Sequence, residues 1–487
     1  MYSDTAFTQQ IKELLELISA PTDKSVVGQA TEYFNQLQRM QQQTQTYQET
    51  IADTTAILKQ QKSDKEKALY KRRLAAAETS LKRFKDEQRE SNLVRHDQLV
   101  SISREILLLA EGIDFEDTVR KSARLLGTIQ LLLPTEGKQV AENNDRSKQL
   151  YKAILTLRLF DELYTNDMID DLFIIKALDN MAPSQYKSFI NIEDESYLEF
   201  AETIKIPLIM VTLLQDIGNH HPVAKTILYG ETRTANPYRV LEHEDRKKLL
   251  QTNYTQTMKY ISQGIGVGKY IGNSKVERDI FDKKEKQKIA FMQSILKRWA
   301  NSKDIIGNLL KVPQVYTSII LSTKENFDYR LLPKVYQILQ MNVERGHCRS
   351  DVVDLLHKIT GMFPMGYGIT YIPKDSSGQP LDRFEYAIVT RLYPEKLDQP
   401  ECRIATRSLT FISRGQDIRI EKSSNLYFPQ TAKSMAKMSK ERLDEILELL
   451  ASNYKERQKL DVLPRCWHAK EFFSIGKNQN LWNKVSE

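Results

Sequence analysis

Cysteine is scarce in this chain of 487 residues, which contains only Cys348, Cys402 and Cys466. The three lie far apart, and no Cys-x-x-Cys pair or Cys/His cluster with the spacing of a zinc site is present. Neither a disulfide framework nor a structural zinc site is therefore expected to hold the fold.

Long apolar runs are also missing. The longest strongly apolar stretch, residues 206–214, contains Pro207 and is far shorter than the roughly 20 residues that a membrane-spanning helix needs. The first ten residues are polar, with no basic patch leading into an apolar run, which is unlike a secretory signal. We expect no membrane span and a cytoplasmic location.

A large excess of charge is lacking as well. Lysine and arginine number 71 and aspartate and glutamate 64, so the net charge of +7 is modest for this length. It favours solubility over a dedicated nucleic-acid-binding protein. The local distribution is less even, because residues 59–90 hold eleven basic side chains against six acidic ones.

Proline is absent between Pro21 and Pro134, which permits long helices. Within this segment an a/d seam of about two heptads is formed by Tyr70, Leu74, Ala77, Leu81 and Phe84. The seam favours a solvated amphipathic helix or helical hairpin. A dimerising or partner-binding coiled coil is the alternative, and a nucleic-acid-binding arm is a third, less favoured one because the charges are mixed.

Helical periodicity continues from residue 117 to Gly361, with Leu155, Leu159 and Leu163 recurring at a spacing of four. Beyond Gly361, glycines and prolines divide the chain into short runs typical of strands in a small β domain. Helix returns near residues 439–454. An aromatic tail follows, which we expect to dock through Trp467, Phe472, Phe473 and Trp482.

The chain is similar to a known family at residues 213–219, Leu-Leu-Gln-Asp-Ile-Gly-Asn, which resemble the His-Asp-Ile-Gly-Lys segment of HD-GYP domains. Those domains are bacterial phosphodiesterases of cyclic di-GMP. The most specific agreement is Gly-Met-Phe-Pro-Met-Gly at 361–366, which resembles the Gly-x-Phe-Pro-x-Gly turn leading into the β tail of such domains. Further agreements follow in order, at Ile227-Leu228 with Gly230, Arg246 with Leu249-Leu250, and Phe327-Asp328. The resemblance covers roughly residues 145–430.

With this resemblance, the predicted fold class is mainly α, with long N-terminal helices, an all-α HD-like domain, a small β tail domain and a C-terminal helix. The expected divisions are an N-terminal helical or coiled-coil region at 1–116, a degenerate HD-GYP-like domain at 117–361, a small β domain at 362–430, and a C-terminal helix and tail at 431–487.

The departures from the family bear directly on function. HD hydrolases bind two or three metal ions through His and Asp side chains, and the metals activate a water for attack at phosphorus. Here Gln215 replaces the histidine, Asn219 replaces the lysine after Gly218, and only Asp216 matches a ligand position. The family's second signature, with its His-His-Glu and Asp-Gly-x-Gly-Tyr-Pro, is not found. An amide is a far poorer ligand than imidazole for transition metals, so the degenerate motif implies an inactive protein without a metal cofactor.

A relocated metal site is the alternative. His220, His221 and His243, together with Asp216, supply side chains that bind iron, manganese or zinc. Adjacent histidines rarely chelate one ion together, so these residues are weak metal candidates. Loop histidines bonded to backbone or water are favoured instead, and for Asp216 a helix-end cap or a buried, hydrogen-bonded carboxylate.

Arg403 and Arg407 form an Arg-x-x-x-Arg pattern that resembles the one with which PilZ domains hold cyclic di-GMP. On one strand the two side chains would share a face. The same spacing recurs at Arg345 and Arg349, so a chance occurrence is favoured. The pair nevertheless defines a candidate ligand-binding site.

The sequence therefore predicts a catalytically inactive HD-GYP-like signalling or scaffold protein. We expect it to act by protein–protein interaction or self-association through its N-terminal helices, in a bacterial pathway linked to cyclic di-GMP or motility. One alternative is a cyclic di-GMP receptor without hydrolysis. Another is an active phosphodiesterase with an unusual iron or manganese site.

Overall fold

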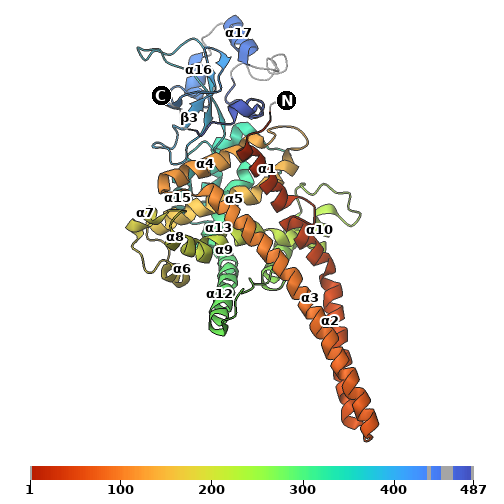
Figure 1. Ribbon diagram of the computed structural model, residues 1–487. Helices are drawn as coiled ribbons and strands as arrows, with labels where there is room; N and C mark the ends of the chain where they lie inside the picture. Colours follow the sequence, from red (N-terminus) through yellow and green to blue (C-terminus); the bar gives the residue numbers. More distant parts are fainter. Residues whose placement is uncertain (1–2, 436–439, 451–463, 484–487) are drawn as a thin grey trace. The chain divides into compact units, whose positions relative to one another are not determined.

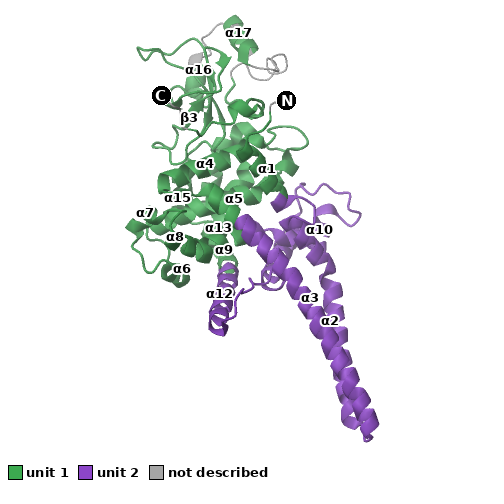
Figure 2. Ribbon diagram, in the orientation of Figure 1, with its two compact units in different colours: residues 1–16, 104–212, 295–487 green, residues 17–103, 213–294 purple. Residues whose placement is uncertain are grey.

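The computed structural model describes residues 3–435, 440–450 and 464–483 (Figure 1). The mainly α class, with long N-terminal helices and a small antiparallel sheet near the C-terminus, is confirmed. The chain forms two compact units, and each is built from separate stretches of sequence (Figure 2). Unit 1 comprises residues 1–16, 104–212 and 295–487, and unit 2 comprises residues 17–103 and 213–294.

Unit 2 is dominated by two long antiparallel helices that lie side by side (Figure 2). The first begins at Ser25, whose side chain accepts a hydrogen bond from the Gly28 N–H and so satisfies one open donor of the first turn. The helices of this unit, some of which continue into unit 1, are α2 (Val26–Gln60), α3 (Asp64–Ala110), η3 (Ile217–His220), α10 (Pro222–Tyr229), α11 (His243–Lys259), η4 (Tyr260–Gly264) and α12 (Lys275–Trp299).

Unit 1 is organised around α5 (Val140–Thr165), which is buried on all sides from Leu150 to Tyr164. The predicted leucine spacing lies on this helix, and an all-round buried surface is expected of a helix at the centre of a domain. α5 contacts α4 (Phe115–Leu132), η1 (Pro183–Gln185), α7 (Tyr186–Phe189), α13 (Ile305–Ile320) and α15 (Ser350–Thr360). The other helices of the unit are α1 (Ala6–Ser19), α6 (Leu172–Ala177), α8 (Glu195–Phe200), the π-helical η2 (Ala201–Lys205), α9 (Ile206–Leu214), η5 (Tyr329–Lys334) and α14 (Val335–Glu344).

The β region of unit 1 contains a four-stranded antiparallel sheet in the order β1-β2-β3-β6 and a two-stranded ribbon, β4-β5. The strands are β1 (Gly368–Tyr371), β2 (Glu385–Val389), β3 (Glu401–Ile404), β4 (Thr406–Arg407), β5 (Thr410–Phe411) and β6 (Asp417–Arg419). The expectation of one continuous strand through Arg403 and Arg407 is wrong. The chain changes sheet after Ile404 and then turns at Ser408 and Leu409, both of which have positive φ.

The junction between helices and sheet falls where the sequence predicts it. Gly361 follows the last residue of α15 with φ +63°, and a side chain there would meet Pro394 at 2.7 Å. Gly366 has φ +78° and lies so close to the Gly127 carbonyl that a Cβ would be 2.9 Å from it. Both positions therefore require glycine for conformation and for space.

The C-terminal segment packs on the β region through its aromatic residues. Trp467, Phe472, Phe473 and Trp482 are all buried, which confirms the expected docking. The helices here are α16 (Pro429–Met435), α17 (Lys440–Leu450), α19 (Lys470–Phe473) and η6 (Gly476–Asn478). The remainder of the helix predicted at 439–454 lies outside the described residues. No described helix combines the length and the apolar composition needed to cross a membrane.

Candidate functional site

The degenerate motif lies where α9 ends and η3 begins. Gln215 is buried, with 5% of its surface exposed, and its backbone carbonyl accepts a hydrogen bond from the Asn253 side chain at 3.3 Å. Asp216 is half-buried and takes the N-cap position of η3, but its side chain makes no capping hydrogen bond there. Asp216 therefore does not act as the side-chain cap of η3.

Gly218 and Asn219 continue the motif against α11. The Gly218 N–H donates to Thr257 Oγ1 at 3.1 Å, and a side chain on Gly218 would come within 2.2 Å of the Asn253 carbonyl oxygen. The glycine of the motif is therefore required for the close approach of η3 and α11. Asn219 is half-buried, and its Oδ1 has no hydrogen-bond partner among the described residues.

The three candidate histidines occupy different settings. His220 is half-buried in η3, and His243 is exposed at the start of α11. His221 caps α10 by accepting the Val223 N–H at 3.2 Å, and its ring meets that of Phe34 edge-on at 5.4 Å. Burial, together with the positive charge of Lys259, lowers the pKa of His221. Within the described ranges, no group of three or more His, Cys, Asp or Glu side chains is arranged to hold a metal ion.

The two arginines of the Arg-x-x-x-Arg pattern are in different sheets. Arg403 on β3 is 6% exposed and forms a two-point ion pair with Asp417 on β6, at 2.6 and 3.1 Å, and also donates to the Asn483 carbonyl. Arg407 on β4 is exposed and donates to Gln416 at 3.4 Å. Arg403 is therefore engaged in joining two strands, and the two side chains do not share the face of one strand.

The most extensive candidate surface is the hairpin of α2 and α3, which we define as residues 26–103. The predicted seam on α3 is present, and its partner is α2 of the same chain, as in the helical-hairpin interpretation. The rings of Tyr47 on α2 and Phe84 on α3 meet across it, with centroids 5.8 Å apart. Half-buried positions recur along the seam at alternating spacings of three and four, at Leu37, Met40, Thr44, Tyr47, Ile51, Thr54 and Leu58 on α2 and at Lys67, Tyr70, Leu74, Ala77, Leu81, Phe84 and Gln88 on α3. Thr55, next to Thr54, is half-buried as well.

The α2 half of this seam was missed by sequence analysis because threonine interrupts it and glutamine surrounds it. The hydroxyl groups of Thr44 and Thr54 bond to the carbonyls of Met40 and Thr50 one turn earlier, so these side chains can face the seam without an unsatisfied polar group. A search for the same alternating spacing that counted threonine as a seam residue would have revealed the α2 half.

The hairpin is anchored at its base to the other helices of unit 2. Arg95 donates to the Gly264 carbonyl at 2.7 Å and lies over the Tyr33 ring, 5.2 Å from its centroid. Nε2 of His96 on α3 lies 3.4 Å from Oε2 of Glu285 on α12. These contacts join the base of the hairpin to the rest of unit 2.

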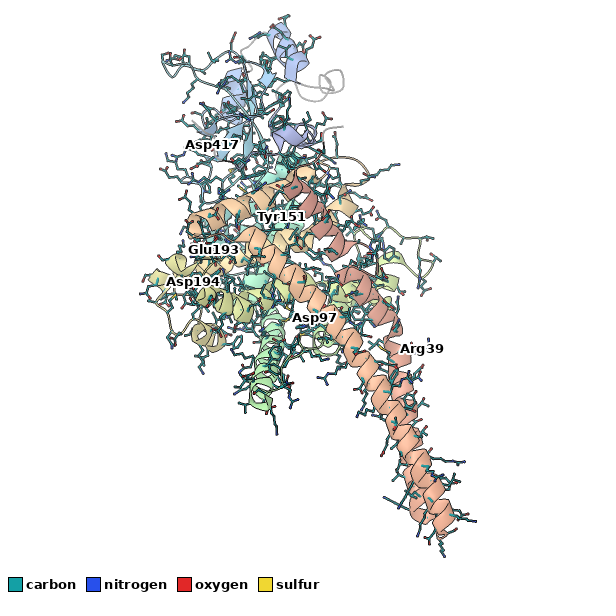
Figure 3. All side chains as sticks on the ribbon, viewed as in Figure 1. Arg39, Asp97, Tyr151, Glu193, Asp194 and Asp417 are labelled. Carbon is teal, nitrogen blue, oxygen red and sulfur yellow. The ribbon has the colours of Figure 1, made fainter. Side chains whose placement is uncertain are left out.

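Away from its base the hairpin is thin and solvated. None of residues 41–91 is fully buried, and nearer the base Arg39 on α2 and Asp97 on α3 are exposed as well (Figure 3). A groove of about 1050 Å³ runs between the two helices near the base and is lined mainly by polar side chains, among them Gln36, Gln45 and Gln88. The surface therefore offers many polar side chains and few apolar ones.

The charge of the outer hairpin is mainly positive. Ten of the eleven basic residues in 59–90 are exposed, and Lys67 is half-buried. Within this fully described stretch, Arg83 and Glu87 form the only ion pair, at 3.0 Å. Most of these cations are therefore available to an external partner.

Comparisons with protein-family models, with curated proteins and with solved structures find no match to this chain.

Proposed function

We propose that this protein acts by protein–protein interaction as an inactive HD-GYP-like signalling or scaffold protein, and that residues 59–90 of the hairpin bind an acidic surface of a partner protein. The observation that carries this proposal is the row of exposed cations on a long helical pair, of which only Arg83 is neutralised by an ion pair within the stretch. Electrostatic complementarity of this kind promotes association and selects partners.

The shape of the hairpin supports a protein partner. Its seam buries side chains only partly, so the two helices present nearly all of their outer surface to solvent over residues 41–91. In coiled coils, charged side chains on the outer flanks of helices set the choice of partner through opposite charges. The mixture of acidic and basic side chains favours a protein over nucleic acid, whose uniform negative charge suits an unmixed basic surface.

The absence of catalysis in this proposal rests on the chemistry of the motif. Gln215 presents an amide where HD hydrolases use imidazole, and the residue is buried. An amide binds transition metals far less well than a histidine. The resemblance to HD-GYP domains supports a place in signalling linked to cyclic di-GMP or motility.

The test is site-specific photo-crosslinking in the native host, with the crosslinking residue in place of Ala75, which is exposed on α3. A control variant of the same chain carries the crosslinking residue in place of Gln251, which is exposed on α11. We expect one discrete protein adduct from position 75 and not from position 251. The identified partner, once purified, should bind the full chain with an affinity that falls as salt is added.

A charge-reversal variant makes this test specific. Arg72→Glu, Lys82→Glu and Arg89→Glu together alter three exposed cations that make no ion pair with any described residue. The matched control reverses Arg246, Lys247 and Lys248, which are exposed on α11 in the same unit. We expect binding to weaken at least tenfold only in the hairpin variant. Equal binding by both variants, or an adduct formed solely with a second copy of the chain, would contradict the proposal.

A further inference from the structure

Unit 1 contains a cavity of about 270 Å³ between the β region and the C-terminal segment. Its aromatic wall is formed by Tyr386 on β2, Phe411 on β5, and Trp467 and Phe472 of the C-terminal segment. Because Trp467 and Phe472 come from the C-terminal segment, the cavity exists only when that segment is docked.

The aromatic rings hold one another in place. Trp467 stacks on Tyr386 with centroids 4.6 Å apart and an angle of 5°, and its Nε1 donates to the Ala387 carbonyl at 3.0 Å. The ring centroid of Phe411 lies 5.9 Å from that of Trp467 and 5.8 Å from that of Phe472. A wall fixed in this way can accept a planar ring with little loss of side-chain entropy.

Phe411 differs from the other wall residues in its exposure. It is 43% exposed, whereas Tyr386, Trp467 and Phe472 are each at most 7% exposed. A large apolar side chain that is open to solvent beside three buried rings marks the side from which a ligand could enter and cover it. Further burial of its ring would then contribute to binding.

Two charged side chains, Lys477 and Glu471, line the cavity and are exposed, but Glu471 already takes part in an interaction within the chain. Lys477 is exposed at the cavity and forms no ion pair with any described residue. Asn478 is 4% exposed, its Nδ2 donates to the Phe472 carbonyl, and its Oδ1 has no partner among the described residues. A buried acceptor of this kind next to a cavity is a position at which a donor is expected.

We infer that this cavity binds a small planar aromatic molecule that carries a negative charge. The ring packs against the aromatic wall beside Phe411, and the anionic group pairs with Lys477. The volume lies just below the range of about 300–1,000 Å³ usual for small-molecule sites, which restricts the ligand to a single or fused ring with short substituents. The inference is independent of the hairpin.

Two matched pairs of probes test the inference on the full chain by calorimetry and ligand-observed NMR. 1-Naphthoate is compared with the neutral 1-naphthamide, and AMP with adenosine, so that the carboxylate and phosphate forms of the charge are separated. We expect at least one anion to bind, and to bind at least tenfold more tightly than its neutral counterpart. No binding by any of the four probes at low-millimolar concentration would overturn the inference.

Variants locate the binding. Phe411→Ala should weaken the binding of the anion and of its neutral counterpart to the same extent. Because the Phe411 side chain is 43% exposed, the fold should tolerate the change. Lys477→Ala should remove most of the difference in affinity between the anion and its neutral counterpart. Lys470→Ala serves as the control, since Lys470 is exposed on the same segment but does not line the cavity. Binding that is unchanged in both Phe411→Ala and Lys477→Ala would place the ligand elsewhere and refute the assignment.

Discussion

Nη2 of Arg158 lies 2.7 Å from Oε1 of Glu111, and both side chains are completely buried in unit 1. Lys205 lies 2.5 Å from the same carboxylate and 3.0 Å from Asp161, which also pairs with Arg158 at 2.9 Å. Two cations and two anions thus neutralise one another in the interior. A buried group of this kind depends on every member, because removing one leaves an uncompensated charge.

Glu111→Ala is therefore expected to destabilise unit 1 by about 3–5 kcal/mol, the usual cost of breaking a buried ion pair. The measurement is urea unfolding followed by circular dichroism. Glu193→Ala is the control, since Glu193 is exposed, and its effect should stay within about 0.5 kcal/mol. Similar midpoints for the two variants would mean that the buried cluster contributes little.

Acid should weaken unit 2 through Glu285. Burial acts to raise the pKa of this carboxyl group, but hydrogen bonds from His96, Lys288 and the Gly268 N–H outweigh it and lower the pKa to about 2 from an ordinary value of 4.5. Because the folded state binds the proton less readily than the unfolded state, the stabilisation is present above pH 4.5 and is lost as the pH falls toward 2.

Glu285→Gln should remove this contribution. The variant is expected to be less stable than the wild-type protein at pH 6, and the gap between them should narrow as the pH is lowered below 4.5. Thermal unfolding of both proteins across this range measures the gap. A gap that stays constant with pH would show that the charge of Glu285 is not responsible.

The two parts of the chain should respond differently to loss of a leucine. Leu155 is fully buried on α5, and Leu155→Ala should lower the free energy of unfolding by about 2–5 kcal/mol because it leaves a cavity. Leu81 is half-buried in the hairpin seam, where water can fill the space, so Leu81→Ala should cost about 1 kcal/mol. Denaturant unfolding compares the two, and hydrogen exchange should show faster exchange along α2 and α3 only in Leu81→Ala.

The purified protein is expected to contain no stoichiometric iron, manganese or zinc and to leave cyclic di-GMP intact when these metals are added. The reason is the amide of Gln215 at the position of a metal-binding imidazole. Elemental analysis paired with a hydrolysis assay measures both. Bound metal with turnover would instead support the phosphodiesterase alternative and direct attention to His220, His221 and His243.

Local patterns predicted much of the fold because they report local physics. The leucine spacing on α5, the seam on α3 and the glycine that ends α15 each depend on residues within a few turns of one another. The prediction of one strand at 403–411 was wrong because the chain turns at Ser408 and Leu409, both of which have positive φ. Serine and leucine rarely adopt positive φ, so the residue types did not indicate a turn.

The sites are less predictable because they join distant residues. Glu111 and Lys205 are 94 positions apart; Glu111 directly follows α3 and Lys205 ends η2, and neither residue alone marks a buried cluster. Arg403 appeared to be a candidate ligand-binding residue, and only the pairing of β3 with β6 reveals Asp417 as its partner. The aromatic cavity likewise requires β2 and β5 to meet the C-terminal segment, which no spacing in the sequence indicates.

The Thr5 N–H donates to Gln479 Oε1 at 2.8 Å, across 474 positions of the same unit. During synthesis at about 5–20 residues per second, the first helix must therefore wait roughly 25–95 s before its final partner leaves the ribosome. Its apolar face, including Ile11 and Leu14, is buried in the finished protein and is exposed for at least part of that interval. The nascent chain should accordingly be a client of chaperones that shield early-emerging helices.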